Sequence, residues 1–378
     1  MSQARWLHNR GVNAKIRPNV LKMIPYAPGK PIEEVQRELG LQRVVKLASN
    51  ENPFGPSPKA LAAVRKAAER MHIYPDGASF ELKSAIAKKF GQPFARVMVG
   101  NGSDELIHLI GLIFLGGENE EMIMGDPSFS RYDPAAQIVP SKLIKVPLDR
   151  KFRHDLCAMA DAVTEKTRLL FIANPNNPTG TIVRKPDVDR FLADLPPYVT
   201  VVLDEAYYEF AADQKDFPNS LEYIDRGFNV IGLRTFSKAY GLAGIRVGYG
   251  FASEDVVDAI NRVREPFDVN SLAQAAAIAA LDDEDHVRMT VDNNRRGLDY
   301  LNDALRAGGA EPMESFANFT FADLGHPAEP VFQALLRKGV ITRAGRAVGN
   351  ENCLRVSVGT PAELEVFAAA FKEVMSEG

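Results

Sequence analysis

The sequence has few cysteines, no long apolar run and no excess of positive charge. Its 378 residues include only two cysteines, Cys157 and Cys353, which lie far apart. No CxxC pair and no cysteine–histidine spacing of the zinc-binding kind is present. We therefore expect neither a disulfide framework nor a metal site, and a reducing, cytoplasmic setting suits the chain.

A membrane or nucleic-acid function is also not expected. The longest apolar run, LIHLIGLIFLGG at 106–117, includes a histidine and is shorter than the roughly 20 residues of a spanning helix. The formal net charge of −4 offers no basic surface for nucleic acid or an anionic membrane. The first thirty residues are basic without an acid, but they lack the serine content of a transit peptide. We interpret them as an N-terminal arm.

The middle of the chain alternates apolar, β-branched runs with helical patterns. Buried strands are expected at 96–100, 121–126, 142–146, 168–174, 199–206, 229–234 and 245–250. In GPSPKALAAVRKAAER, Ser57 is a candidate N-cap and Pro58 a first helical residue. The alternation predicts an α/β fold in which helices flank a mostly parallel sheet.

The pattern changes after about residue 280. A long polar helix is followed by short strands and by a closing helix at 361–375, which together indicate a smaller α+β unit. We therefore expect a large domain at 51–282 and a small C-terminal domain at 283–378. Residues 1–50 would form the arm and a segment that joins the interface or the small domain.

In open parallel sheets, ligands bind outside the carboxyl ends of the strands. The loops that follow the expected strands contain NGSDE, DPSFSRY, NPNNPTG, DEAYYEF and TFSK. NPNNPTG is either a plain connector or a loop that presents asparagine amides to a ligand oxygen. The site is expected where these loops meet.

Several residues in these loops suit a phosphorylated carbonyl compound. Asp204 follows a buried run, where a carboxylate needs a cation or several donors. Lys238 suits an imine with an aldehyde, because burial or a nearby cation can lower its pKa. Arg246 offers phosphate a planar, bidentate partner. The helix that NGSDEL opens could also bind phosphate, or its acids Asp104 and Glu105 could simply complement the helix dipole.

The order and spacing of these motifs resemble a known family. The chain is similar to fold-type-I pyridoxal-phosphate enzymes of the aspartate aminotransferase superfamily, and within it most closely to the histidinol-phosphate aminotransferases. The resemblance covers nearly the whole chain and rests on YAPGKPIEEVQRELG, VKLASNENPFGPSPKA, YPDG, GNGSDEL, NPNNPTG, DEAYYEF, RTFSKAYGLAGIRVGY and LRVSVGT.

The resemblance implies pyridoxal 5′-phosphate as the cofactor and a role for each matching residue. Lys238 would bond to the cofactor aldehyde and later move the proton, while Asp204 would pair with the ring nitrogen. Tyr207 would act with them. The implied cofactor contacts are Asn177 and Tyr207 at the ring hydroxyl oxygen, Phe129 on the ring face, and Ser103, Asp104, Thr235, Ser237 and Arg246 around the phosphate. Arg234, which ends a strand, is assigned no role.

The resemblance also implies a homodimer, in which Tyr74 of YPDG reaches the phosphate of the partner subunit. The substrate would be held by Tyr26, Arg343 and Arg355, together with Asn177. Arg346 lies in the same loop, TRAGRAVGN, and competes with Arg343 for that role.

The implied reaction is transamination of L-histidinol phosphate with 2-oxoglutarate, giving imidazole acetol phosphate and glutamate, in histidine biosynthesis. Guanidinium groups suit both substrates, because they bind phosphate and carboxylate alike. Three alternatives remain open. They are an aromatic amino-acid (Phe/Tyr) aminotransferase or dual-specificity enzyme, a phosphothreonine decarboxylase with the same cofactor, and a pyridoxal-phosphate-binding transcription regulator. The last is the least expected, because only a short arm precedes the motifs.

Overall fold

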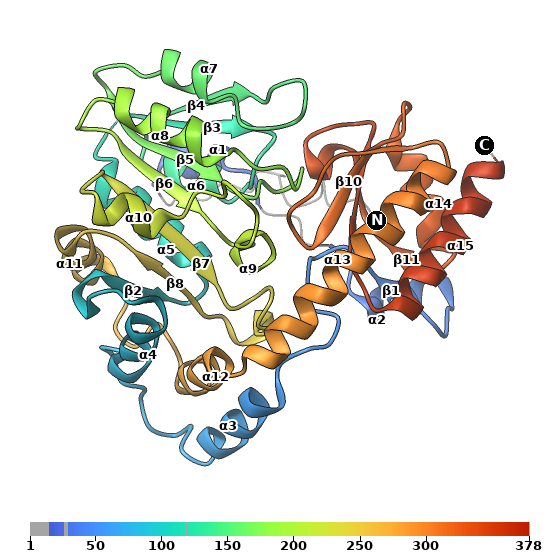
Figure 1. Ribbon diagram of the computed structural model, residues 1–378, viewed down its shortest axis with the longest axis horizontal. Coiled ribbons are helices and arrows are strands. Elements are labelled where there is room, and N and C mark those ends of the chain that lie inside the picture. The colour runs from blue at the N-terminus through green and yellow to red at the C-terminus, as the bar shows by residue number, and fades with distance from the viewer. Residues whose placement is uncertain (1–14, 26–28, 118, 378) are drawn as a thin grey trace.

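The computed structural model describes residues 15–25, 29–117 and 119–377. Figure 1 shows two bodies of unequal size, with the long helix α13 (Glu284–Ala307) leading from the larger to the smaller. In the part of the chain that is described, no helix combines the length and apolar character needed to cross a bilayer.

The larger body contains a seven-stranded sheet in the order β2-β8-β7-β6-β5-β3-β4. Only β8 runs antiparallel to its neighbours, so the prediction of a mostly parallel sheet is confirmed. The strands are β2 (Val97–Gly100), β3 (Glu121–Asp126), β4 (Lys142–Pro147), β5 (Thr167–Ala173), β6 (Thr200–Asp204), β7 (Val230–Thr235) and β8 (Gly248–Phe251).

One expected strand begins later than the sequence suggested. The apolar run 245–250 predicts a strand throughout, but the strand starts at Gly248. Ala243–Ile245 forms a 3-10 turn and Arg246 has a φ of 60°, so the chain turns before it enters β8. This left-handed conformation is uncommon for a residue with a side chain.

Helices cover both faces of the large sheet and bury its apolar side chains. One core cluster joins the sheet to α4, α7, α8, α10 and α12, and the other joins it to α5, α6 and α11. These helices are α4 (Phe80–Phe90), α5 (Ser103–Phe114), α6 (Tyr132–Ile138), α7 (Leu156–Asp161), α8 (Lys185–Asp194), α10 (Ser220–Asp225), α11 (Glu254–Val263) and α12 (Ser271–Leu281). The short α9 (Tyr208–Ala211) follows β6, and α3 (Pro58–Ala68) packs on α12. Ser57 caps α3 as predicted, since its side chain accepts from Ala60 N at 3.1 Å.

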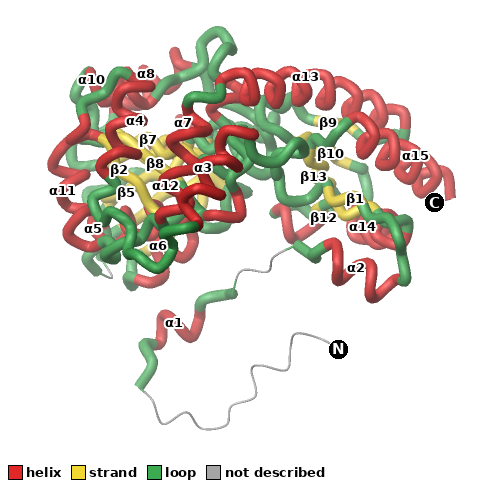
Figure 2. The backbone as a smooth tube through the Cα atoms, turned by 90° about the horizontal axis from the view of Figure 1, so that it is seen from below, coloured by secondary structure: helices red, strands yellow, loops and turns green. Residues whose placement is uncertain are grey.

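The smaller body contains a four-stranded antiparallel sheet in the order β12-β13-β10-β9. Its strands are β9 (Glu311–Pro312), β10 (Phe319–Asp323), β12 (Arg343–Ala344) and β13 (Cys353–Ser357), and its helices are α14 (Ala328–Arg337) and α15 (Pro361–Glu377). Figure 2 shows α13 and α15 beside this sheet, with α14 on another side of it. Its core is separate from the cores of the larger body.

The segment before residue 50 contributes to the smaller body. β1 (Val45–Lys46) pairs in parallel with β11 (Val340–Ile341), and α2 (Ile32–Leu39) packs nearby through Val35. α1 (Pro18–Lys22) instead contacts the larger body, where Asn19 Nδ2 donates to two carbonyls at the end of α6. The domain limits expected at residues 50 and 282 stay a prediction.

Candidate active site

A pocket of about 230 Å³ lies at the carboxyl ends of the strands of the large sheet. All five loops expected there contribute to its wall. Ten of the predicted site residues line it: Ser103, Asp104, Phe129, Asn177, Asp204, Tyr207, Thr235, Ser237, Lys238 and Arg246.

Asp204 is the last residue of β6 and is only 4% exposed. Its Oδ2 accepts from the hydroxyl of Tyr132 at 2.7 Å, and its Oδ1 accepts from Ala206 N at 3.1 Å. Burial raises the pKa of Asp204 to about 6, although both hydrogen bonds act in the opposite direction. The carboxylate therefore lies in a place where a cation would be strongly favoured.

Tyr132 was missed in the sequence. It is fully buried, lines the pocket and holds the Asp204 carboxylate. Its position in DPSFSRY, one of the strand-end loops, was the only signal available, because no sequence pattern reveals which aromatic residue turns toward Asp204.

Lys238 lies across the pocket, in the loop after β7. Its Nζ donates to the Ser49 carbonyl at 3.2 Å and lies 5.8 Å from the centre of the Tyr207 ring. Burial, and then the charge of Arg355, lower the pKa of Lys238 to about 8. A substantial share of this amine is therefore neutral, and able to act as a nucleophile, slightly above neutral pH.

Arg246 lies against the N-terminus of α5. Gly102, which precedes this helix, has a φ of 81°, and a Cβ there would lie 2.4 Å from Nη2 of Arg246. A Cβ on Gly248 would lie 2.3 Å from Ser103 N. The two glycines thus allow the guanidinium and the free N–H groups of the helix to face the same space, which suits an anion.

The two acids in the first turn of α5 make different contacts. Glu105 Oε2 turns back and accepts from Asn101 N at 2.6 Å. Asp104 Oδ2 lies 3.5 Å from Nη2 of Arg246, and both side chains are about two-fifths exposed. Glu105 is therefore engaged elsewhere, whereas an anion beside Arg246 would compete with Asp104 for the guanidinium.

Asn177 and Tyr207 are held from both bodies of the molecule. Asn177 Oδ1 accepts from Nη1 of Arg355 at 2.6 Å. The Tyr207 hydroxyl accepts from Asn50 Nδ2 at 2.9 Å. Asn50 is another contact that the sequence did not reveal.

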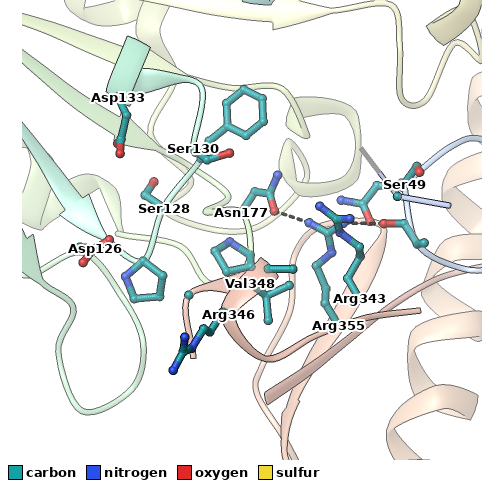
Figure 3. A pocket seen from close by; sticks show the side chains of 18 of the residues that line it. Ser49, Asp126, Ser128, Ser130, Asp133, Asn177, Arg343, Arg346, Val348 and Arg355 are labelled. Carbon is teal, nitrogen blue, oxygen red and sulfur yellow. Dashed lines mark hydrogen bonds between the residues drawn. The ribbon is translucent and has the colours of Figure 1, made fainter. Parts of the chain in front are cut away.

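A second pocket, of about 300 Å³, adjoins the first and is lined by both bodies. The two share Ser49, Phe129, Asn177 and Lys238. Figure 3 shows Arg343 and Arg355 extending toward Asn177, with a hydrogen bond between Arg355 and Asn177.

The side chains of Arg343 and Arg346 differ in orientation in this pocket. Both residues line it, but the Arg346 guanidinium points away from Asn177 in Figure 3. The Arg346 side chain is 91% exposed, and its Nε donates to Glu351 at 3.0 Å. Of the two arginines, Arg343 is therefore the one that extends toward Asn177.

One predicted residue, Tyr74, is not brought into these pockets. Tyr74 is 79% exposed and stacks on Phe267, with 4.7 Å between ring centres. Tyr26 lies outside the described residues.

The residues present fit pyridoxal phosphate. The buried carboxyl of Asp204 suits a protonated ring nitrogen, the amine of Lys238 suits an aldehyde, and the glycine-lined space beside Arg246 suits a phosphate. Among the described residues, no group of three or more histidines, cysteines or acids could hold a metal ion.

Comparison with known proteins agrees with this geometry. Residues 42–371 match the family model "Aminotransferase class I and II". The chain belongs to this family. Among the aminotransferases that it resembles, the histidinol-phosphate aminotransferase of Moorella thermoacetica is 49% identical over 363 residues, which cover 96% of this chain and 93% of that protein. Histidinol-phosphate aminotransferase 2 of Carboxydothermus hydrogenoformans is 46% identical over 360 residues, covering 95% and 99%.

A solved aminotransferase structure shows the same architecture. The histidinol-phosphate aminotransferase from Sinorhizobium meliloti, in complex with pyridoxal-5′-phosphate, superposes with a TM-score of 0.89 at 30% identity. The match covers 96% of this chain and 98% of that one. The predicted fold class, with its mostly parallel sheet and its smaller second unit, is thereby confirmed.

Proposed function

We propose that this aminotransferase uses pyridoxal phosphate to transfer the amino group of L-histidinol phosphate to 2-oxoglutarate. One observation carries the proposal. Lys238, with its lowered pKa, and the buried carboxyl of Asp204 share one pocket, and an arginine-lined pocket adjoins it. The names of the relatives described above support the choice of substrate.

Each residue of the pocket then has a chemical task. Bound pyridoxal phosphate supplies an aldehyde that accepts the amino group and a ring that withdraws electrons from the substrate carbon. Asp204 keeps a proton on the ring nitrogen, and the Tyr132 hydroxyl holds Asp204 in place. Nζ of Lys238 is the base that takes the proton from the substrate carbon. Asn177 and Tyr207 orient the ring oxygen.

Arg343 and Arg355 bind the anionic ends of the two substrates. Both line the pocket next to Lys238, and Arg355 is fixed by hydrogen bonds to Asn177 Oδ1 and, at 2.6 Å, to the Ala48 carbonyl. Because a guanidinium pairs with phosphate or carboxylate, one pair of arginines can serve both the amino donor and the keto acid.

Steady-state kinetics test the substrate. The expected result is a kcat/KM for histidinol phosphate that exceeds that for phenylalanine by a hundredfold or more, about 3 kcal/mol, each with 2-oxoglutarate. The reverse preference would make the protein an aromatic amino-acid aminotransferase.

Lys238→Ala tests the chemistry, because it should remove transamination and the visible absorption of the bound cofactor. A variant that turned over normally would rule out the proposed role of Lys238.

We further propose that a second copy of the chain covers the surface around Tyr74 and that the Tyr74 hydroxyl completes the phosphate site of that copy. Tyr74 and Phe267 are exposed and stack on each other, and Met71 and Ile73, close to Tyr74 in sequence, are exposed as well. Contiguous exposed apolar side chains of this kind are typical of an interface. Tyr74 has no place in the pockets of its own subunit.

Mixed dimers test the crossing of Tyr74. Tyr74→Phe should weaken cofactor binding, and Lys238→Ala should be inactive. In a dimer of one Tyr74→Phe and one Lys238→Ala subunit, the site that retains Lys238 receives a native Tyr74 from its neighbour. Its cofactor affinity should therefore equal that of the wild type. The weak affinity of Tyr74→Phe in that site would place Tyr74 in its own subunit, and a monomer by analytical ultracentrifugation would exclude the dimer.

A further inference from the structure

A buried ion pair lies behind the ends of β6 and β7, on the side away from the pocket. Arg234 is 0% exposed and Glu205 is 1% exposed, and Nε of Arg234 donates to Oε2 of Glu205 at 2.8 Å. Neither residue lines the two pockets of the active site. A pair so deeply buried is not a general source of stability, because desolvation of the charges offsets their attraction.

The surroundings hold this pair in one geometry. Glu205 accepts from Ser220 N at 2.7 Å and from Ser220 Oγ at 2.9 Å. Nη2 of Arg234 donates to Asn219 Oδ1 at 3.1 Å, and the guanidinium lies 3.4 Å from the centre of the Tyr208 ring. A Cβ on Gly232 would lie 2.1 Å from Ser220 Oγ, so any larger residue at this position of β7 would collide with Ser220.

Each partner of the pair is next in sequence to a pocket residue. Glu205 follows Asp204, and Arg234 precedes Thr235. Successive side chains of a strand point to opposite faces, so the pair and the pocket residues lie on opposite sides of the same two strand ends. The strands are parallel here, and Glu205 N donates to Leu233 O at 2.8 Å.

In the turn after β6, too, one residue contacts the ion pair and its neighbour in sequence lines the pocket. Tyr208 stacks on Arg234 behind the sheet, while its neighbour Tyr207 lines the pocket. The one guanidinium thus contacts the rear of the segment whose front presents Asp204 and Tyr207.

We propose that Arg234 and Glu205 are positioning residues that fix Asp204 and Tyr207, at the ring end of the cofactor, relative to Thr235 at its phosphate end. The inference rests on the proposed function. Neither residue touches the substrate or the cofactor, and both act through the strand ends that they join.

Two variants separate positioning from stability. Arg234→Lys retains the charge but loses the planar group that contacts Glu205, Asn219 and Tyr208 together. In the double variant Arg234→Met, Glu205→Gln, neither partner of the ion pair is left as a buried charge without the other, and an acceptor for Ser220 N remains. Leu192→Ala, on α8 in the same core cluster, is the matched control that lowers stability away from the strand ends.

The readouts are the dissociation constant of pyridoxal phosphate from absorption titration of the cofactor-free protein, the Tm of that protein, and kcat with saturating cofactor. Both Arg234 variants should bind the cofactor about ten- to a hundredfold more weakly and lose kcat by a similar factor, since misplacement by about 1 Å has effects of this size. The KM for histidinol phosphate should stay within about threefold, and Leu192→Ala should change only the Tm.

A cofactor affinity and kcat within about twofold of the wild type in either Arg234 variant, whatever its Tm, would overturn the proposal. Failure of the proposed function gives a different result, because the wild type itself would then lack cofactor absorption or transamination.

Discussion

Asp204 and Lys238 show how one pocket moves two pKa values in opposite directions. Burial raises the pKa of the Asp204 carboxyl to about 6 and lowers that of the Lys238 amine to about 8. In both residues burial disfavours the charged form. Each is therefore poised to gain from the group that the proposed cofactor brings, a ring cation for Asp204 and an aldehyde for Lys238.

Asp204→Asn should stabilise the cofactor-free protein near neutral pH. The folded-state pKa is raised above the ordinary value of 3.8, so the wild type loses stability as the pH rises from about 4 to 6 and stays penalised above it. The shift of about 2 units corresponds to at most about 3 kcal/mol. Urea unfolding should show a higher free energy of unfolding for the variant than for the wild type at pH 7.5 but not at pH 4. The variant should also bind the cofactor more weakly. An equal gain at both pH values would contradict the ionised state of Asp204.

Lys238 should capture the cofactor at a rate that rises with pH around a midpoint near 8. The neutral amine is the nucleophile, and desolvation of its charged form lowers the pKa from the ordinary 10.5. Stopped-flow absorption after mixing pyridoxal phosphate with the cofactor-free protein measures this midpoint. Arg355→Met should move it upward, because the charge of Arg355 is the second cause of the lowered pKa. A midpoint above 10 in the wild type would refute the desolvated amine.

At the scale of elements, the N-terminus of α5 and the turn before β8 form one structural unit. Gly102 and Gly248 allow these two segments to approach so closely that Arg246 lies over the start of the helix. The left-handed φ of Arg246 belongs to the same arrangement. The proposed phosphate site therefore depends on backbone shape as well as on charge.

Gly102→Ala should weaken cofactor binding by about ten- to a hundredfold. The new Cβ would displace the Arg246 guanidinium, and a φ of 81° is strained for any residue except glycine. Gly244→Ala is the matched control, because a Cβ there meets open space in the turn that leads to Arg246. Absorption titration with pyridoxal phosphate measures the effect. Equal losses of cofactor affinity in the two variants would show that the weaker binding does not come from displacement of the Arg246 guanidinium.

The sequence predicted the elements better than their contacts. Apolar periodicity located the strands and the polar helix α13, because burial determines that pattern directly. It misplaced the start of β8, since the left-handed Arg246 has no apolar signature. Tyr132, Asn50 and the pair Arg234–Glu205 were not predicted, because each contact joins segments far apart in the chain. The resemblance to a family supplied the roles of the pocket residues, which remain predictions.

At the scale of the whole molecule, the active site lies where the two bodies meet. The larger body supplies Lys238 and Asp204, and the smaller supplies Arg343 and Arg355. The hydrogen bond from Arg355 to Asn177 joins them directly. In the proposed function, Arg355 therefore couples substrate binding to the relative placement of the two bodies.

Arg355→Lys should raise the KM of both substrates by about ten- to a hundredfold, because an ammonium cannot reproduce the fork that binds a carboxylate or phosphate. The visible absorption of the bound cofactor should persist. Arg346→Lys is the control, because Arg346 is exposed at the edge of the same pocket. Its KM values for both substrates should stay within about threefold of those of the wild type. Steady-state kinetics with each substrate varied in turn measures both variants. A larger increase in KM for Arg346→Lys than for Arg355→Lys would contradict the proposed substrate-binding role of Arg355.

The pairing of β1 with β11 has a consequence for biosynthesis. Val45 lies beside Val340, so a strand made early must wait for one made almost 300 residues later. At the usual rate of about 5–20 residues per second, that wait is on the order of 15–60 seconds on the ribosome. The seven strands of the large sheet all emerge during this interval. The larger body of the nascent chain should therefore fold first. The smaller body should fold last, because β1 stays unpaired until β11 has been made.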